Sequence, residues 1–226
     1  MTYFTCISFT LFSYYTGFQL YKKYKWDWLN PLYTGSIILI LLLLTCHIRE
    51  ETFQQGSMIF NQLLKLAVVS LAVPLYKQWP LIRKNYKKIC TGVIGGSILG
   101  IFTVVTMAQL FHLNQQILAS LITKSVTLPI ALMISSDLGG LSSTTVFFVI
   151  SSGLISLIIG PKLLNQFRIK TKGARGLAMG TSGQMLGANR SRLWGEEEGA
   201  MGSVAMITSA IFLTILMPIL PFLLKI

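Results

Sequence analysis

Charged residues are scarce in this 226-residue chain. Only 12% of the residues are Asp, Glu, Lys or Arg, seven of them acidic, whereas 53% are hydrophobic. A soluble domain usually carries about 25% charged residues, which hydrate its surface. The composition therefore excludes an ordinary soluble domain and predicts an all-α integral membrane protein, because helices satisfy their backbone polar groups within lipid.

Cysteine and histidine are also rare, and their positions exclude several kinds of site. Cys6, Cys46 and Cys90 show no CxxC spacing and no even count, which excludes a zinc site or a disulfide framework. His47 and His112 lie far apart, without an HExxH motif or a carboxylate partner. No GxSxG nucleophile motif occurs. We therefore predict no catalytic residue, no metal site, no cofactor and no enzymatic activity.

The excess of basic residues has a membrane interpretation. The 19 Lys and Arg residues give a net charge of +12, but they gather in short clusters between apolar runs. Such clusters are typical of cytoplasmic loops, where they also meet anionic lipid headgroups. We expect a lipid bilayer as partner and no nucleic acid. The clusters within 22–25, 77–88 and 162–175 then lie inside, and the N-terminus lies outside.

Six apolar runs are long enough, or nearly so, to cross about 30 Å of hydrocarbon. They cover residues 2–21, 31–48, 58–76, 89–111, 144–161 and 200–224. Two further segments, 116–140 and 174–195, have membrane length but are too rich in Gly, Ser and Thr for lipid-facing helices. We predict one polytopic bundle with an N-terminal four-helix region (1–115) and a repeat-containing region (116–226) that holds both broken segments.

The positive-inside rule limits the topology of 116–140. An even number of crossings must separate the basic clusters 77–88 and 162–175, and the spans 89–111 and 144–161 already supply two. About 25 residues cannot form two more crossings. A re-entrant hairpin that enters from outside remains. The segment after Ala174 forms either a second hairpin, entering from the cytoplasm, or a kinked spanning helix.

A weak internal repeat relates the two broken segments. Residues Lys124 to Pro161 match residues Thr181 to Pro218 in pattern. Each copy starts with a polar, Ser-bearing stretch, passes an acidic corner marked by glycine and ends an apolar span with proline. Two hairpins would give the copies opposite topology, and inverted repeats that meet at the midplane are common in secondary transporters. We favour this inverted repeat over a parallel one.

The first broken segment combines a cation, hydroxyls and a helix breaker. Lys124, Ser125 and Thr127 precede Pro129, which lacks a backbone donor and frees a carbonyl. Lipid cannot satisfy such groups, so the stretch should face protein or a wet cavity. Lys124 either binds an anion there or extends to the outer headgroups.

Acids and glycines mark the corners of the two repeats. Asp137 is followed by Gly139 and Gly140, which suit a tight turn. Asp137 either binds a coupling proton or cation or caps the turn, and we favour the cap. Glu198, in the corner of the second repeat, is the other candidate for ion coupling.

The second broken segment alternates glycines with polar side chains. The glycines recur every three or four residues and allow close helix packing; they are Gly176, Gly180, Gly183 and Gly187. Packing does not explain the polar residues between them, because buried polar groups need partners; these are Thr181, Ser182, Gln184 and Asn189. Arg190 can hold a carboxylate with two hydrogen bonds. We predict that both segments bind a small organic anion.

The motifs together resemble the LrgB/CidB family over nearly the whole chain. They are KSVTLPIA at 124–131, GG at 139–140, GP at 160–161, ARGLAMGT at 174–181 and EGA at 198–200. The resemblance implies a multi-pass protein of the bacterial plasma membrane, antiholin-like or holin-like, that influences murein hydrolase activity and cell lysis with a small partner of the LrgA/CidA type. Relatives, including a plastid one, are described as transporters of glycolate, glycerate or pyruvate.

The sequence departs from this family at two places. Gln184 stands where relatives commonly carry histidine, and Leu128 stands where threonine is usual. The missing histidine is the one motif side chain that titrates near neutral pH, so the resemblance implies no proton coupling at this position. Two functions stay open: a carboxylate transporter with its site in 124–137 and 181–192, or a non-transporting regulatory subunit. Either form is compatible with a homo-oligomer.

Overall fold

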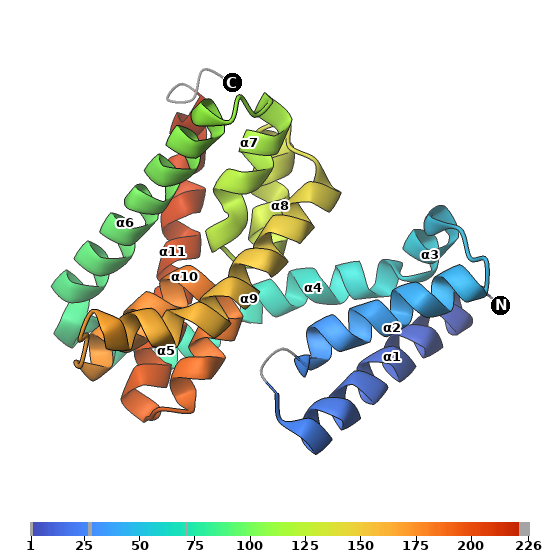
Figure 1. Cartoon of the computed structure of the whole chain (residues 1–226), viewed down its shortest axis with the longest axis horizontal. Coiled ribbons are helices and arrows are strands. Elements are labelled where there is room, and N and C mark those ends of the chain that lie inside the picture. Colours follow the sequence, from blue (N-terminus) through green and yellow to red (C-terminus); the bar gives the residue numbers. More distant parts are fainter. Residues whose placement is uncertain (1, 27–28, 71, 222–226) are drawn as a thin grey trace. The chain divides into compact units, whose positions relative to one another are not determined.

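The computed structural model describes residues 2–26, 29–70 and 72–221, and Figure 1 shows helices connected by short loops throughout them. The α-helices are α1 (Thr2–Tyr24), α2 (Pro31–Thr45), α3 (Glu50–Gly56), α4 (Met58–Ser70), α5 (Ala72–Lys77), α6 (Trp79–Leu110), α7 (Gln115–Ile122), α8 (Leu128–Asp137), α9 (Ser142–Gln166), α10 (Lys172–Arg192) and α11 (Glu196–Leu216). Two 3-10 helices are η2 (Thr123–Ser125) and η3 (Met217–Ile219). The predicted helical fold class is confirmed.

The chain forms two compact units, Met1–Val69 and Ser70–Ile226. In the first, α1 and α2 form an antiparallel hairpin, and α3 packs on α1. The side chain of Asn30 accepts a hydrogen bond from Leu32 N at 3.1 Å and so caps α2. A methyl group at Gly17 would lie 2.9 Å from Gly35 N, so glycine permits the close approach of these two helices.

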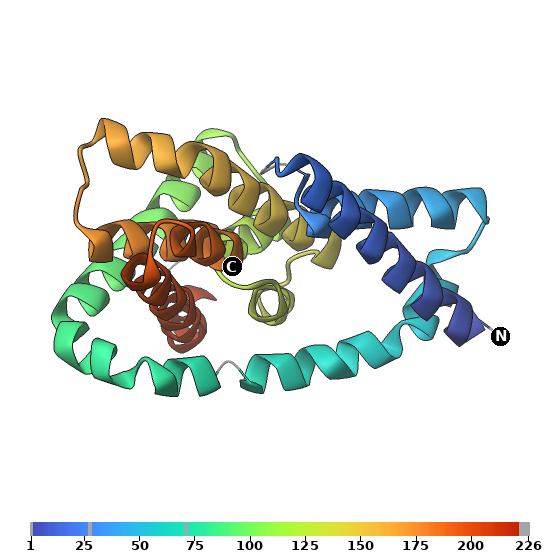
Figure 2. The ribbon, with the colours of Figure 1, turned by 90° about the horizontal axis from the view of Figure 1, so that it is seen from below.

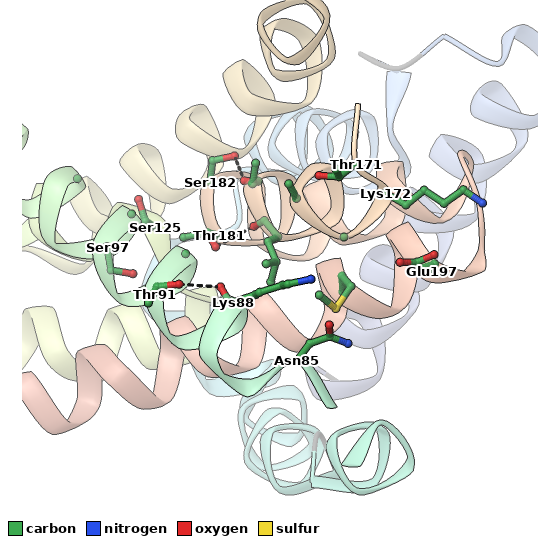
Figure 3. Close-up of a pocket in the computed structure, with 18 of the residues that line it drawn as sticks. Asn85, Lys88, Thr91, Ser97, Ser125, Thr171, Lys172, Thr181, Ser182 and Glu197 are labelled. Atoms are coloured by element: carbon green, nitrogen blue, oxygen red, sulfur yellow. Dashed lines mark hydrogen bonds between the residues drawn. The ribbon is translucent and has the colours of Figure 1, made fainter. Parts of the chain in front are cut away.

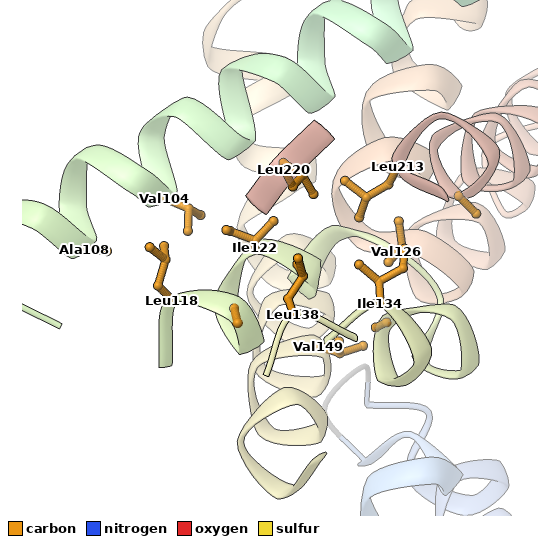
Figure 4. Close-up of a cluster of buried hydrophobic side chains, with 13 residues drawn as sticks. Val104, Ala108, Leu118, Ile122, Val126, Ile134, Leu138, Val149, Leu213 and Leu220 are labelled. Carbon is orange, nitrogen blue, oxygen red and sulfur yellow. The ribbon is translucent and has the colours of Figure 1, made fainter. Parts of the chain in front are cut away.

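The second unit contains two apolar clusters. The larger one joins α6, α7, α8, α9 and α11, as Figure 4 shows for Val104, Leu118, Ile134, Val149 and Leu213. The smaller one joins α6, α10 and α11 through Ile89, Val93, Leu177, Met201, Val204 and Ala205. These clusters hold the broken segments against the long helices, and the predicted division at residue 115 stays a prediction.

Three helices of the described chain are long and apolar enough to cross a membrane: Trp79–Leu110, Ser142–Gln166 and Glu196–Ile219. Six spans and an inverted repeat therefore stay predictions. The predicted span 58–76 is divided between α4 and α5, and residue 71 lies outside the described residues. The basic cluster at 77–88, predicted as a cytoplasmic loop, is mostly helical: Lys77 ends α5, and the other basic residues belong to α6, which has a kink at Asn85. Lys and Arg favour helix, which explains why this stretch continues into the span.

The first broken segment consists of α7, η2 and α8. Its helix is interrupted at Val126 and Thr127, whose backbones are extended, and Pro129 lies in the first turn of α8. The segment closes on itself because Leu141 N donates to Ser120 Oγ at 2.9 Å. Ser135 and Thr145 join α8 to α9 through a hydroxyl hydrogen bond of 2.6 Å.

The second broken segment is a helix that reverses direction. Gln184 has φ 51° and ψ −130°, which divides α10 into arms at 172–183 and 185–192. A methyl group at Gly187 would meet the carbonyl oxygen of Met179, although eight residues of continuous helix would separate them by about 12 Å. The Arg175 guanidinium also lies 4.4 Å from the centre of the Trp194 ring. Both ends of the segment are therefore adjacent, as a hairpin requires.

Both arms pack on the start of α11, and Figure 2 shows α10 and α11 side by side from below. Glycines allow this contact. A methyl group at Gly180 would meet the carbonyl of Gly202, and one at Gly176 would meet the carbonyl of Glu198. The side of the membrane from which the hairpin enters stays a prediction.

Candidate functional site

The tips of the two broken segments touch. The side-chain amide of Gln184 donates from Nε2 to the carbonyl oxygen of Lys124 at 2.6 Å. Gln184 is only 6% exposed, so this hydrogen bond is largely shielded from solvent. In the predicted repeat, Thr127 and Gln184 are each the fourth residue of their copy, and the structure has a helix break at both.

A helix begins directly after each break. The N-terminus of α8 follows Thr127, and that of the second α10 arm follows Gln184. Helix N-termini carry unpaired N–H groups and a partial positive charge, which favour an anion. Thr127 Oγ1 is buried there and has no hydrogen-bond partner in the described part of the chain.

A cavity of about 790 Å³ lies beside this junction, between α6, η2, α10 and α11. In Figure 3, Ser97 and Ser125 lie at one end, and Lys172 and Glu197 lie at the other. Its charged lining residues are Lys88, Lys124, Lys172 and Glu197, and its hydroxyls come from Thr91, Ser97, Ser125, Thr171, Thr181 and Ser182. Ammonium and hydroxyl donors are the groups that bind carboxylates.

A second cavity of about 410 Å³ lies against α9 and shares Lys124, Ser125 and Ser182 with the first. The hydroxyls of Ser156 and Ser182 are hydrogen bonded at 2.7 Å on its wall. The tip of the first broken segment therefore stands between two cavities, which makes Lys124 accessible from more than one direction.

The structure separates the predicted site residues into four groups. Lys124, Ser125, Thr181 and Ser182 line the main cavity, and Gln184, Thr127 and Pro129 lie at the breaks. Asn189 and Arg190 belong to the second arm of α10, outside the lining described for this cavity. Asp137 is exposed at the end of α8, and Glu198 is 6% exposed in the first turn of α11. The predicted roles of all these residues stay predictions.

The predicted glycines serve turns and close contacts. Gly139 has φ +77°, the left-handed conformation that a turn between α8 and α9 requires. A methyl group at Gly140 would meet the Ser135 and Ser120 hydroxyls, and one at Gly183 would lie 2.8 Å from Ser156 Oγ. These positions allow the turns and close contacts that hold the site together.

Sequence reasoning missed the contribution of α6, because 89–111 is apolar enough to be interpreted as an ordinary span. One signal was present. Gly92, Gly96 and Gly100 recur at four-residue spacing, with Thr91 just before the first and Ser97 directly after the second, which places a small, partly polar face on one side of the helix. The cavity residues from this face are Lys88, Thr91, Gly92, Gly96, Ser97 and Gly100.

Comparison with known proteins gives a family. The model of the LrgB-like family matches residues 10–223. The chain belongs to this family. Among LrgB-like relatives, "Uncharacterized protein YxaC" of Bacillus subtilis is 35% identical over 91% of this chain and 89% of its own length. "Holin-like protein CidB" of Staphylococcus epidermidis is 33% identical over 95% and 93%, and that of Staphylococcus aureus is 32% identical over the same shares.

No solved structure matches this LrgB-like chain. The family and the apolar helices together identify a helical membrane protein. In residues 2–26, 29–70 and 72–221, no three His, Cys, Asp or Glu side chains gather as metal ligands would.

Proposed function

We propose that this LrgB-like chain transports small organic anions of the pyruvate or glycolate type across the bacterial plasma membrane. The observation that carries the proposal is the junction of the two broken segments, where Gln184 binds the Lys124 carbonyl beside a hydroxyl-rich cavity. Broken helices that meet at a polar site are the usual substrate site of secondary transporters.

The anion would bind at the inner end of the cavity. The Lys124 ammonium supplies the charge, and the hydroxyls of Ser125 and Thr181 supply further donors. Charge-assisted hydrogen bonds of this kind are stronger than neutral ones, and they gain further strength where water is partly excluded. Because hydroxyls and one ammonium also bind water well, a small carboxylate can leave again, which transport requires.

In the proposed orientation, the cavity opens toward the cytoplasm, so the structure would be an inward-facing state. Lys88 and Lys172 line it and come from the basic clusters expected in the cytoplasm. Toward the opposite ends of α6 and α9, the larger apolar cluster packs α7 and α8 against the long helices. Transport would then require α7 and α8 to move relative to α6 and α11, as two repeats do in alternating access.

The inverted topology is testable with single cysteines. We expect a cysteine at Ser142 to react with a membrane-impermeant thiol reagent only from outside, and one at Glu197 only from inside. The background lacks Cys6, Cys46 and Cys90. Reaction of the Ser142 position only from inside would reject the model.

The decisive experiment is uptake of labelled pyruvate, glycolate and lactate into liposomes that contain the purified protein, with and without a pH gradient. Lys124→Ala should reduce the initial rate by about 100-fold, because a charged hydrogen bond contributes about 1.5–3 kcal/mol. Arg190→Ala should also abolish uptake if the second arm contacts the anion. Lys162→Ala removes an exposed cation that lines neither cavity and is the matched control. Undiminished uptake by both Lys124→Ala and Arg190→Ala would reject the site.

A second function is favoured by the names of the relatives. Two of the compared proteins are called holin-like, and the family resemblance connects such proteins to murein hydrolase activity and lysis. In this alternative the chain is a regulatory subunit that binds an LrgA/CidA-type partner. It predicts no flux by folded, purified chain and copurification with a small membrane protein. Saturable flux would instead make the lysis phenotype a consequence of carboxylate movement.

A further inference from the structure

We propose that the glycine face of α6, formed by Gly92, Gly96 and Gly100, sets the size of the largest anion that can reach Lys124. This inference rests on the proposed transport function and assigns its size limit to a helix outside both broken segments. All three glycines line the main cavity. Gly92 faces Leu177 of α10, and Gly96 faces Thr181.

The spaces beside Gly92 and Gly96 show where α6 approaches α10 most closely along this face. A methyl group at Gly92 would lie 3.7 Å from Leu177 Cδ1, and one at Gly96 would lie 3.6 Å from Thr181 Cγ2. Both distances are ordinary van der Waals contact, so any larger side chain there would project across the cavity. Because glycine has no side chain, a space remains between the surfaces of α6 and α10 although their backbones are close.

Gly100 occupies the inner end of the face. Besides the main cavity, it lines a space of about 20 Å³ together with Ser97, Lys124 and Ser125. No atom lies within 4 Å of a methyl group at Gly100. A side chain at this position would therefore fit without a backbone clash, and it would occupy the approach to Lys124.

Volume explains why the glycine face, rather than the polar groups, would select by size. Each water occupies about 30 Å³ of liquid, so a cavity of about 790 Å³ is far larger than a two- or three-carbon acid. Lysine and hydroxyls bind the carboxylate of a long acid as well as that of a short one. The distance between the α6 face and α10 is the feature that discriminates between them.

Gly95 provides a matched control on the same helix. A methyl group at Gly95 also has no atom within 4 Å, but Gly95 is not among the residues described as lining the cavity. Leucine at position 95 or 100 therefore changes helix propensity equally, and only the substitution at 100 fills the cavity.

The test measures uptake of glycolate, lactate and 2-hydroxyhexanoate by liposomes containing Gly100→Ala, Gly100→Val, Gly100→Leu or Gly95→Leu. We expect the rate of the longest acid to fall first along the series. Lactate uptake should fall about tenfold with leucine, because the leucine side chain would occupy the approach to Lys124. Gly95→Leu should match the wild-type protein. Equal uptake of all three acids by Gly100→Leu, or equal loss in Gly95→Leu, would overturn the inference.

A chemical readout separates this inference from the proposed function. In the cysteine-free background, Gly100→Cys should react with a small water-soluble methanethiosulfonate at least tenfold faster than with a bulky one, whereas Gly95→Cys should react with neither in intact liposomes. Similar reactivity of the two positions would overturn the inference even if wild-type uptake is present. Absence of wild-type uptake together with the expected labelling would reject transport and leave the glycine face as the wall of a wet cavity.

Discussion

The two broken segments meet at the hydrogen bond between Gln184 and Lys124 but are held in place differently. The first is fixed by side chains, with Ser120 binding Leu141 and Ser135 binding Thr145, and by the larger apolar cluster. The second is fixed largely by backbone contact, because its glycines place α10 directly against the carbonyls of α11. A side-chain hydrogen bond from Arg192 to Ser203 at 3.2 Å also joins these helices. Side chains can rotate to absorb a small change, whereas backbone atoms cannot.

Because of this difference, we expect the two segments to differ in how far they can move relative to their neighbours. A segment held by rotatable hydroxyls can move relative to its neighbours and remake its contacts, while a segment fitted backbone to backbone moves as one body with its partner helix. We therefore expect α10 and α11 to move together in any transport cycle, with α7 and α8 as the other moving body.

The largest effect is expected from adding one methyl group to the second segment. Gly180→Ala would force its methyl into the carbonyl of Gly202, so the two helices must separate, and overpacking of this kind costs about 1–3 kcal/mol or more. We expect a lower thermal unfolding midpoint in detergent and loss of most folded protein. The loss should appear even without substrate, because it concerns packing alone.

The matched change in the first segment is Gly140→Ala. Its methyl would meet the hydroxyls of Ser135 and Ser120, which can rotate at a cost of about 1 kcal/mol for each hydrogen bond lost. It would also lie 3.0 Å from Ser120 N, a contact that a small backbone shift can relieve. The comparison between the segments predicts a clearly smaller fall in the unfolding midpoint than for Gly180→Ala. An equal or larger fall for Gly140→Ala would break the comparison.

Much of this arrangement could be predicted from the sequence, because composition and periodicity are local signals. The helical class and both interruptions followed from proline, glycine and hydroxyl residues within apolar runs. The sequence left open whether Lys124 lines a cavity or extends to the headgroups. The contribution of α6 to the cavity could not be predicted, because a cavity wall depends on which face of a span meets α10. The location of the second break could not be predicted either. Gly183 is the residue that a turn would favour, but it packs on Ser156, and Gln184 adopts the positive φ.

The smallest change in stability is expected from substitutions at the two breaks, Gln184 and Thr127. Gln184 holds φ 51°, which costs a side-chain-bearing residue about 1–3 kcal/mol, whereas Thr127 has an ordinary extended backbone. Gln184→Gly and Gln184→Ala both lose the hydrogen bond to Lys124, but only glycine relieves the strain. We expect the glycine variant to be the more stable of the two by about 1 kcal/mol in thermal unfolding.

The equivalent substitutions at Thr127 should give the reverse order. Alanine accepts φ −61° and ψ 142° without strain, and glycine there adds only freedom to the unfolded chain. Thr127→Ala should therefore be more stable than Thr127→Gly by about 0.5–1 kcal/mol. If the alanine variant were more stable than the glycine variant at both positions, the strain assigned to Gln184 would be absent. Opposite stability orders of the Ala and Gly variants at the two positions would show that the breaks differ in backbone conformation. Thr127 would be relaxed, whereas Gln184 would be held in a strained conformation by its hydrogen bond to the Lys124 carbonyl.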